Sequence, residues 1–165
     1  MSVINKKSLI SALVNITILT IIILLISYFF INNKLIIGPV LIFLGLISLI
    51  PIFFLKISLK TLRGDIIFGA IDNGVLAIFA LSGAELFGIL GAIIGSLVGN
   101  AITDGIAGIF EGYEWQKIKI SKMKSNRTTL TVALGKLAGC LFGAGIILTI
   151  AWSVYPLLKI FIYSL

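Results

Sequence analysis

The chain has 165 residues, of which 59% are hydrophobic and 12% are charged, and its mean hydropathy is +1.22. An ordinary soluble domain has apolar residues at about half of its positions and charges at about a quarter, so this composition excludes that class. The net charge of +7 could indicate a nucleic-acid partner, but the basic residues stand between apolar runs and form no basic face. We therefore expect an integral membrane protein whose basic residues meet the lipid bilayer and its anionic headgroups, with no nucleic acid as partner.

Five long apolar runs follow one another along the chain, and none alternates apolar with polar residues as membrane strands do. Each has at least about 18 residues, which is enough for a helix to cross a hydrocarbon core of about 30 Å. We therefore predict an all-α fold, a single polytopic domain over residues 1–165 with five transmembrane helices. The predicted spans are about 9–31, 35–55, 65–82, 86–112 and 130–163.

Short polar segments separate these runs. The sequence INNK at 31–34 predicts a turn between the first two spans, and Pro51 is expected to kink or fray the end of the second. The sequence SGAE at 82–85 predicts a short turn between the third and fourth spans. The five spans are joined by four connections, so the chain reverses direction four times and successive spans are antiparallel.

The basic residues predict which ends of the spans face the cytoplasm. Segments 1–8, 56–64 and 113–127 hold ten of the thirteen lysines and arginines, whereas the turns at 31–34 and 82–85 hold only Lys34. Positive residues are retained on the cytoplasmic side of membranes. We therefore expect the N-terminus in the cytoplasm and the C-terminus outside.

Glycines recur every four residues on the last two spans, at Gly91, Gly95 and Gly99 and again at 135, 139 and 143. Residues four apart share one helix face, so each triplet makes a smooth stripe that a neighbouring backbone can approach closely. We predict that spans three to five form a tight bundle and that the first two are lipid-facing or peripheral. The alternative is that the glycines line a path or permit helix movement.

Two related stretches, GAIDNGVLAIF at 69–79 and NAITDGIAGIF at 100–110, each carry an aspartate inside an apolar run. At 1.5 Å per residue, Asp72 lies about 10 Å and Asp104 about 12 Å from the cytoplasmic ends of their spans. The two carboxylates are therefore expected in one layer, turned toward each other. The candidate cation site consists of Asp72, Asp104, Glu111 at the cytoplasmic mouth, and the amide oxygens of Asn73 and Asn100.

An intramembrane carboxylate costs about 2.5–3.5 kcal/mol at a helix centre, so it normally finds a partner or water. Besides binding a cation or proton, Asp72 or Asp104 could pair with Lys136, or stay protonated and bond to a backbone carbonyl. The following glycines predict short helix breaks at 73–74 and 104–105, which would free carbonyls beside the carboxylates. The remaining acidic residues, at 65, 85 and 114, are expected to be solvated at the interfaces.

The chain has no histidine and one cysteine, Cys140, which we interpret as a small packing residue. Without histidine, the groups left for a metal are carboxylates, amides, Met123 and backbone carbonyls, which favour hard or intermediate cations. We expect no resident cofactor, and Fe²⁺, Mn²⁺ or a similar divalent cation would be a transported substrate.

The segment LRGDIIFGAIDNGVLAIFAL, followed by a glycine-rich span that ends in GIFEGYEWQKIKISKMKS, resembles the first helical pair of the vacuolar iron transporter family. The resemblance covers about residues 62–124, and two further spans precede it. It implies a helical membrane fold that transports iron or a related metal. On this resemblance Asp72 matches the intramembrane metal-binding aspartate and Glu111 the glutamate at the cytoplasmic end of the next span, with Met123 as a cytoplasmic methionine.

Two functions follow as hypotheses. The first is a small membrane transporter for a divalent metal or a proton, using the carboxylates of the third and fourth spans and assembled as a homo-oligomer, a dimer in the first instance, through its glycine stripes. The second is a non-catalytic subunit of a larger membrane complex, with the carboxylates in structural ion pairs. The stretch DGIAGIFEG lacks the arginine and the later aspartates of the CDP-alcohol phosphotransferases, so we expect no enzyme. The isoleucine- and lysine-rich composition favours the plasma membrane of a prokaryote.

Overall fold

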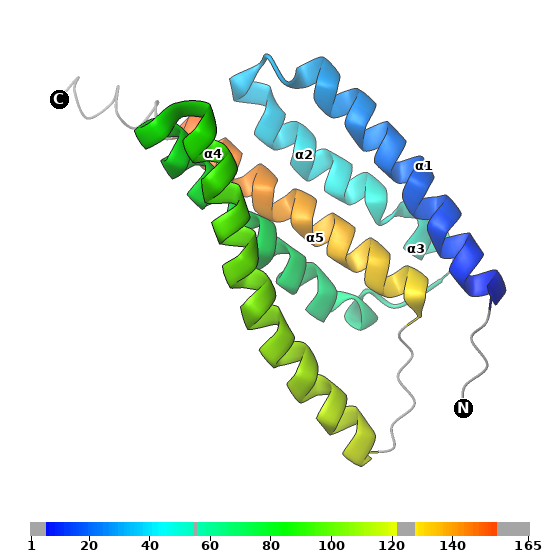
Figure 1. The fold of residues 1–165 in the computed structure, drawn as a ribbon. Helices are drawn as coiled ribbons and strands as arrows, with labels where there is room; N and C mark the ends of the chain where they lie inside the picture. The colour runs from blue at the N-terminus through cyan, green and yellow to red at the C-terminus, as the bar shows by residue number, and fades with distance from the viewer. Residues whose placement is uncertain (1–5, 55, 122–127, 155–165) are drawn as a thin grey trace.

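The computed structural model of this protein describes residues 6–54, 56–121 and 128–154, and of residues 6–8, 11, 60, 110–121 and 154 the backbone alone. These residues form helices joined by short turns, with no strand among them (Figure 1). The elements are α1 (Lys6–Phe30), α2 (Lys34–Ser48), α3 (Ile50–Phe54), a 3₁₀ turn η1 (Leu59–Thr61), α4 (Arg63–Ser121), α5 (Thr129–Thr149) and a π-helical turn η2 (Ile150–Val154). The predicted all-α class is confirmed for this part of the chain.

Four of the described helical stretches are long and apolar enough to cross a membrane: Ala12–Phe30, Lys34–Phe54, Arg63–Ile109 and Thr129–Ser153. The membrane character predicted from composition is therefore supported. The second stretch is interrupted as expected near Pro51, since α2 ends at Ser48 and α3 starts at Ile50. Proline fits in the first turn of α3, where its missing N–H would have no helical acceptor.

Helix α4 is a hairpin of two arms. All of its residues are helical except Phe87 (φ −135°, ψ 16°) and Gly88 (φ 62°, ψ −143°), where the helix folds back on itself. Glycine suits this point because residues with a side chain rarely adopt such a backbone conformation. We call residues 63–86 the first arm and residues 89–121 the second arm. The turn predicted at 82–85 is wrong, because serine, alanine and glutamate there continue the first arm.

Contacts between the arms fix their register. A Cβ atom added at Gly91 would collide with the backbone oxygen of Gly83, and one added at Gly95 would collide with that of Phe79. The midpoint of each pair is residue 87. One added at Gly99 would lie 3.1 Å from Cα of Leu76, a pair whose midpoint lies between residues 87 and 88. The arms are therefore antiparallel and in close backbone contact along the first glycine stripe, as predicted.

The second glycine stripe packs on a neighbouring face of the same first arm. A Cβ atom added at Gly139 would collide with the backbone oxygen of Ile66, and one added at Gly143 would collide with that of Ala70. The first arm therefore contacts both the second arm and α5. The predicted tight bundle of these three helical segments is confirmed.

The expectation that the first two helices are peripheral is correct for α1 and wrong for α2. A Cβ atom added at Gly145 of α5 would lie 2.9 Å from the backbone oxygen of Gly38, so these helices also touch through glycine. The Ser153 hydroxyl donates a hydrogen bond to the Leu35 carbonyl at 3.0 Å, which ties the last turn of the bundle to the start of α2. Glycine on both partners outweighs the high isoleucine and leucine content of α2.

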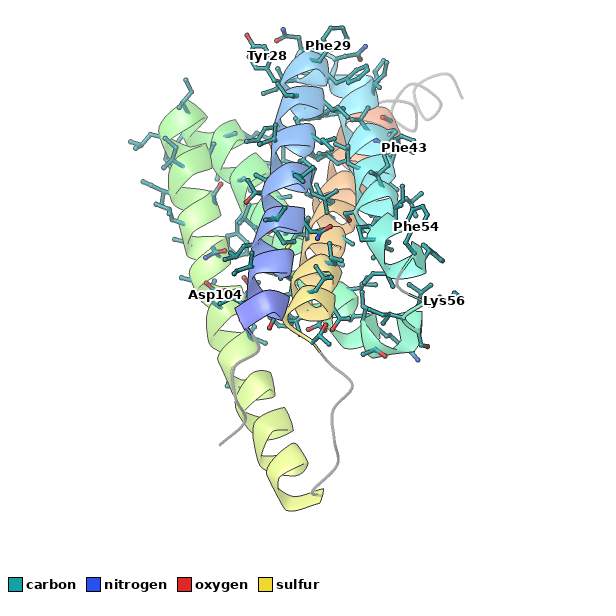
Figure 2. The ribbon with its side chains drawn as sticks, turned by 90° about the vertical axis from the view of Figure 1, so that its right-hand side faces the viewer. Tyr28, Phe29, Phe43, Phe54, Lys56 and Asp104 are labelled. Carbon is teal, nitrogen blue, oxygen red and sulfur yellow. The ribbon has the colours of Figure 1, made fainter. Side chains whose placement is uncertain are left out.

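The starts of α1, α4 and α5 lie at one end of the bundle, and the α1–α2 turn and the tip of the α4 hairpin lie at the other (Figure 1). Lys56 stands at the first end and Tyr28 and Phe29 at the opposite one (Figure 2). We call the first end the basic end. The last turns of the second arm extend beyond the other helices on that side. The fourth run was expected to end at 112, but residues 113–121 contain no glycine or proline and the helix continues.

Candidate functional site

Asp72 of the first arm accepts a hydrogen bond from the hydroxyl of Thr103 on the second arm. Thr103 is 3% exposed and Asp72 is half-buried, so this bond lies inside the contact between the arms. The midpoint of the two residues again lies between 87 and 88, in the register set by the glycines. Because Thr103 stands four residues after Gly99, it continues the glycine stripe and faces the first arm.

Asp104 lies at the predicted level, but the partner of Asp72 is Thr103 and not Asp104. Consecutive helix residues point about 100° apart, so when Thr103 faces the first arm Asp104 is turned away from it. Its side chain is exposed, and its Oδ2 accepts a hydrogen bond from Asn100 Nδ2 at 2.8 Å. The common layer is confirmed, and the expectation that the two carboxylates face each other is wrong.

The helix is continuous around both aspartates. Residues 73–74 and 104–105 are helical, and Phe87 and Gly88 are the non-helical residues of α4. The predicted breaks at these two places are therefore wrong, because isolated glycines inside a packed apolar helix cost only about 1 kcal/mol each. Asn73 is half-buried on the first arm beside Asp72.

The side chains of Glu111 and Met123 lie outside the part of the chain that the structure describes. Glu111 belongs to the helical backbone of the second arm, two turns after Asp104 and on nearly the same face, but its side chain lies outside the described part. Met123 lies outside the described residues altogether. The roles expected for these two residues stay predictions.

Asp65 is a buried acidic residue near the start of the first arm. It was expected to be solvated, but it is 4% exposed, and a Cβ atom added at Gly135 would lie 2.8 Å from the Asp65 Cβ. The glycine stripe of α5 lets the first arm approach so closely that this carboxylate is covered. Its spacing of seven residues from Asp72 puts both on one face of the first arm, and that spacing was the available signal.

Helix α5 brings two more functional groups to this side of the first arm. The Lys136 ammonium lies 5.5 Å from the centre of the Phe68 ring, within the range of a cation–π contact. Cys140, one turn further along α5, interacts electrostatically with both Asp72 and Lys136. Cys140 is half-buried, and its backbone N would lie 2.9 Å from a Cβ atom added at Gly69, which fits a small packing residue.

Asp72 of the first arm therefore has polar groups near it from both neighbouring helical segments, the Thr103 hydroxyl of the second arm and Cys140 of α5. The described residues contain no group of three or more histidine, cysteine, aspartate or glutamate side chains that could hold a metal ion. No family model, no curated protein and no solved structure matches the chain. The resemblance to the vacuolar iron transporters stays a prediction.

Proposed function

We propose that the chain crosses the bilayer five times, with its N-terminus in the cytoplasm and its C-terminus outside, in the plasma membrane of a prokaryote. The α4 hairpin supports five crossings over four, because its shorter arm of 24 residues is about 36 Å long and exceeds a core of about 30 Å. The basic end of the bundle supports the orientation, because positive residues are retained in the cytoplasm.

In this arrangement the protein transfers protons across the membrane through Asp72. The observation that carries this proposal is the hydrogen bond from Thr103 to Asp72 inside the contact between the two arms. Ionisable groups buried within membrane helices commonly belong to ion or proton pathways. Asp72 meets this description, since it is half-buried and in reach of groups from the second arm and from α5.

The hydroxyl of Thr103 can serve both protonation states of Asp72. It has one hydrogen and three acceptors around it: Asp72 Oδ1, and the backbone oxygens of Gly99 and Asn100 at 3.1 Å each. When Asp72 is ionised, the hydroxyl donates to it. When Asp72 is protonated, the carboxyl can donate to the hydroxyl oxygen, whose own hydrogen then turns to a carbonyl. No buried polar group loses its partner in either state.

The ligands around Asp72 favour a proton over a divalent metal as the transported ion. A divalent cation takes several oxygen ligands, whereas a proton needs one carboxylate. The described residues contain no group of three or more histidine, cysteine, aspartate or glutamate side chains that could hold a metal ion. The iron transporter resemblance would instead make Asp72 and Glu111 ligands of Fe²⁺ or Mn²⁺, and uptake of either metal by the reconstituted protein would support that alternative.

The test is proton flux into liposomes that contain the purified protein and a pH-sensitive dye, driven by a potassium gradient with valinomycin. We expect the wild type to acidify the lumen and Asp72→Asn to reduce the rate to that of empty liposomes. Glu85→Gln, the same charge change at an exposed site near the tip of the hairpin, is the matched control and should keep the wild-type rate. Undiminished flux through Asp72→Asn, or no flux through the wild type, would exclude the proposal.

A second candidate is the non-catalytic subunit of a membrane complex, in which Asp72 and Lys136 compensate each other's charge. It is favoured by the interaction of both groups with Cys140. In that case Asp72→Asn and Lys136→Met should each destabilise the protein while the double variant recovers much of the loss, because removing one member of a buried pair leaves the other charge unpaired. The wild type would then show no flux alone.

A further inference from the structure

The second arm carries a polar pair on a face that no other described helix covers. Asn100 and Asp104 are hydrogen-bonded to each other one turn apart. Asp104 is exposed, and Figure 2 shows where it lies on the second arm. Leu90, Ile93 and Leu97 precede them at alternating spacings of three and four residues, and all three are more than half exposed. This spacing is that of the contact positions in a two-stranded coiled coil. We call these five residues the outer seam.

The polar pair of the outer seam is incomplete within one chain. The Asn100 amide has two hydrogens, and one is donated to Asp104 Oδ2. The second hydrogen and the other carboxylate oxygen have no partner among the described residues. Each chain therefore presents one spare donor and one spare acceptor side by side, at a depth where an unpaired carboxylate is unfavourable.

We propose that the outer seam is the interface of a homodimer, in which two copies pack through their second arms. Around a two-fold axis along the bundle, both Asp104 residues lie at one level. An Asn100 amide that reaches Asp104 of its own chain is then at the right height to reach Asp104 of the second copy. Each Asn100 then donates to the Asp104 of the other copy, so the same contact forms twice, as two-fold symmetry requires. The glycine stripes cannot serve as the interface, because both are filled by the first arm. The proposal rests on the membrane arrangement proposed above.

Disulfide cross-linking in membranes tests it. In a Cys140→Ala background, Leu97→Cys in the outer seam should give a strong dimer band on oxidation. Ile71→Cys is the matched control, since it is also exposed and lies on the first arm at the level of Asp104. A dimer band from Ile71→Cys and none from Leu97→Cys, or no dimer from either, would overturn the proposal.

Single-molecule photobleaching of labelled protein in liposomes gives the dimerisation constant. Two reciprocal intramembrane hydrogen bonds correspond to about a tenfold change in the dimerisation constant, so Asn100→Ala with Asp104→Ala should weaken it by about that factor. Asp104→Asn keeps an acceptor and removes the repulsion between two carboxylates, so it should dimerise at least as tightly as the wild type. If the double alanine variant dimerises as the wild type does, the outer seam is not the interface.

The membrane arrangement can fail separately. If a water-soluble maleimide labels Leu97→Cys readily in intact membranes, the second arm does not cross the bilayer. If Leu97→Cys is protected from the reagent but does not cross-link, the arrangement stands and the dimer proposal alone is refuted. In that outcome the Asp104 side chain would reach toward the basic end of the bundle, and lipid headgroups there would be its partner.

Discussion

Replacing Gly139 by alanine tests how the first arm of α4 is held against α5. The added methyl group would collide with the backbone oxygen of Ile66 and would lie 3.0 Å from the backbone N of Ala70. Both obstacles are main chain inside a helix, so they cannot turn aside as the end of a flexible side chain could. The two helices must separate, and the contact is lost along the whole stripe.

The magnitude follows from a comparison with Gly74→Ala. Alanine gains about 1 kcal/mol over glycine in a helix interior at both positions, so that gain cancels between the two variants. At Gly74 the nearest atoms would be 3.9 Å from the new methyl group, which is ordinary van der Waals contact. The difference is then the overpacking penalty at Gly139, about 1–3 kcal/mol. In thermal unfolding this corresponds to a midpoint about 2–12 °C lower for Gly139→Ala than for Gly74→Ala.

The native cysteine provides the assay. Cys140 is half-buried in the contact between the first arm and α5, so a thiol-reactive fluorophore reports when that contact opens during heating in detergent micelles. Circular dichroism on the same samples shows whether helix content is lost at the same temperature. Equal midpoints for the two variants, or a higher midpoint for Gly139→Ala, would refute the inference that α5 and the first arm touch through this glycine.

Three further substitutions probe the hairpin. Gly88→Ala should lower the unfolding midpoint, because its φ of 62° and ψ of −143° cost a side chain about 1–3 kcal/mol, whereas Gly64→Ala, with open space around it, should not. Thr103→Val should slow proton flux by about threefold to tenfold through loss of one intramembrane hydrogen bond, and Thr103→Ser should stay near the wild-type rate. Equal rates for Thr103→Val and the wild type would contradict the role proposed for the Thr103 hydroxyl. Gly95→Ala should separate the arms and slow flux as Thr103→Val does, although it removes no polar group, and flux unchanged in this variant would argue against close contact as the requirement.

The helices and the glycine contacts could be predicted from the sequence because both depend on local patterns. A continuous apolar run and a small residue at every fourth position are visible without knowledge of the fold. The tip of the hairpin could not be located in this way. Polar residues at 82–85 are compatible with a helix, while Gly83, Gly88 and Gly91 were equally able to accept a positive φ, and only Gly88 does so.

The common level of Asp72 and Asp104 was predicted correctly, but the partner of Asp72 was not. Depth along a helix changes by 1.5 Å per residue, but the direction of the side chain changes by about 100°, so an estimate of level cannot decide which of two adjacent residues faces the neighbour. The glycine stripe did contain that information. Continued by fours from Gly99 it reaches Thr103 and then Ala107, both buried, and it passes beside Asp104.

The same stripe explains why a threonine can reach Asp72 at all. A hydroxyl on a short side chain spans the gap to a neighbouring helix only when the two backbones lie close, and the glycines at 91, 95 and 99 bring the arms to that separation. The close approach also buries Thr103 and half-buries Asp72, which strengthens the bond and makes an unpaired carboxylate there more unfavourable. Packing and hydrogen bonding at Asp72 therefore depend on each other. In the proposed function, a proton that changes the charge of Asp72 therefore acts on a contact between helices.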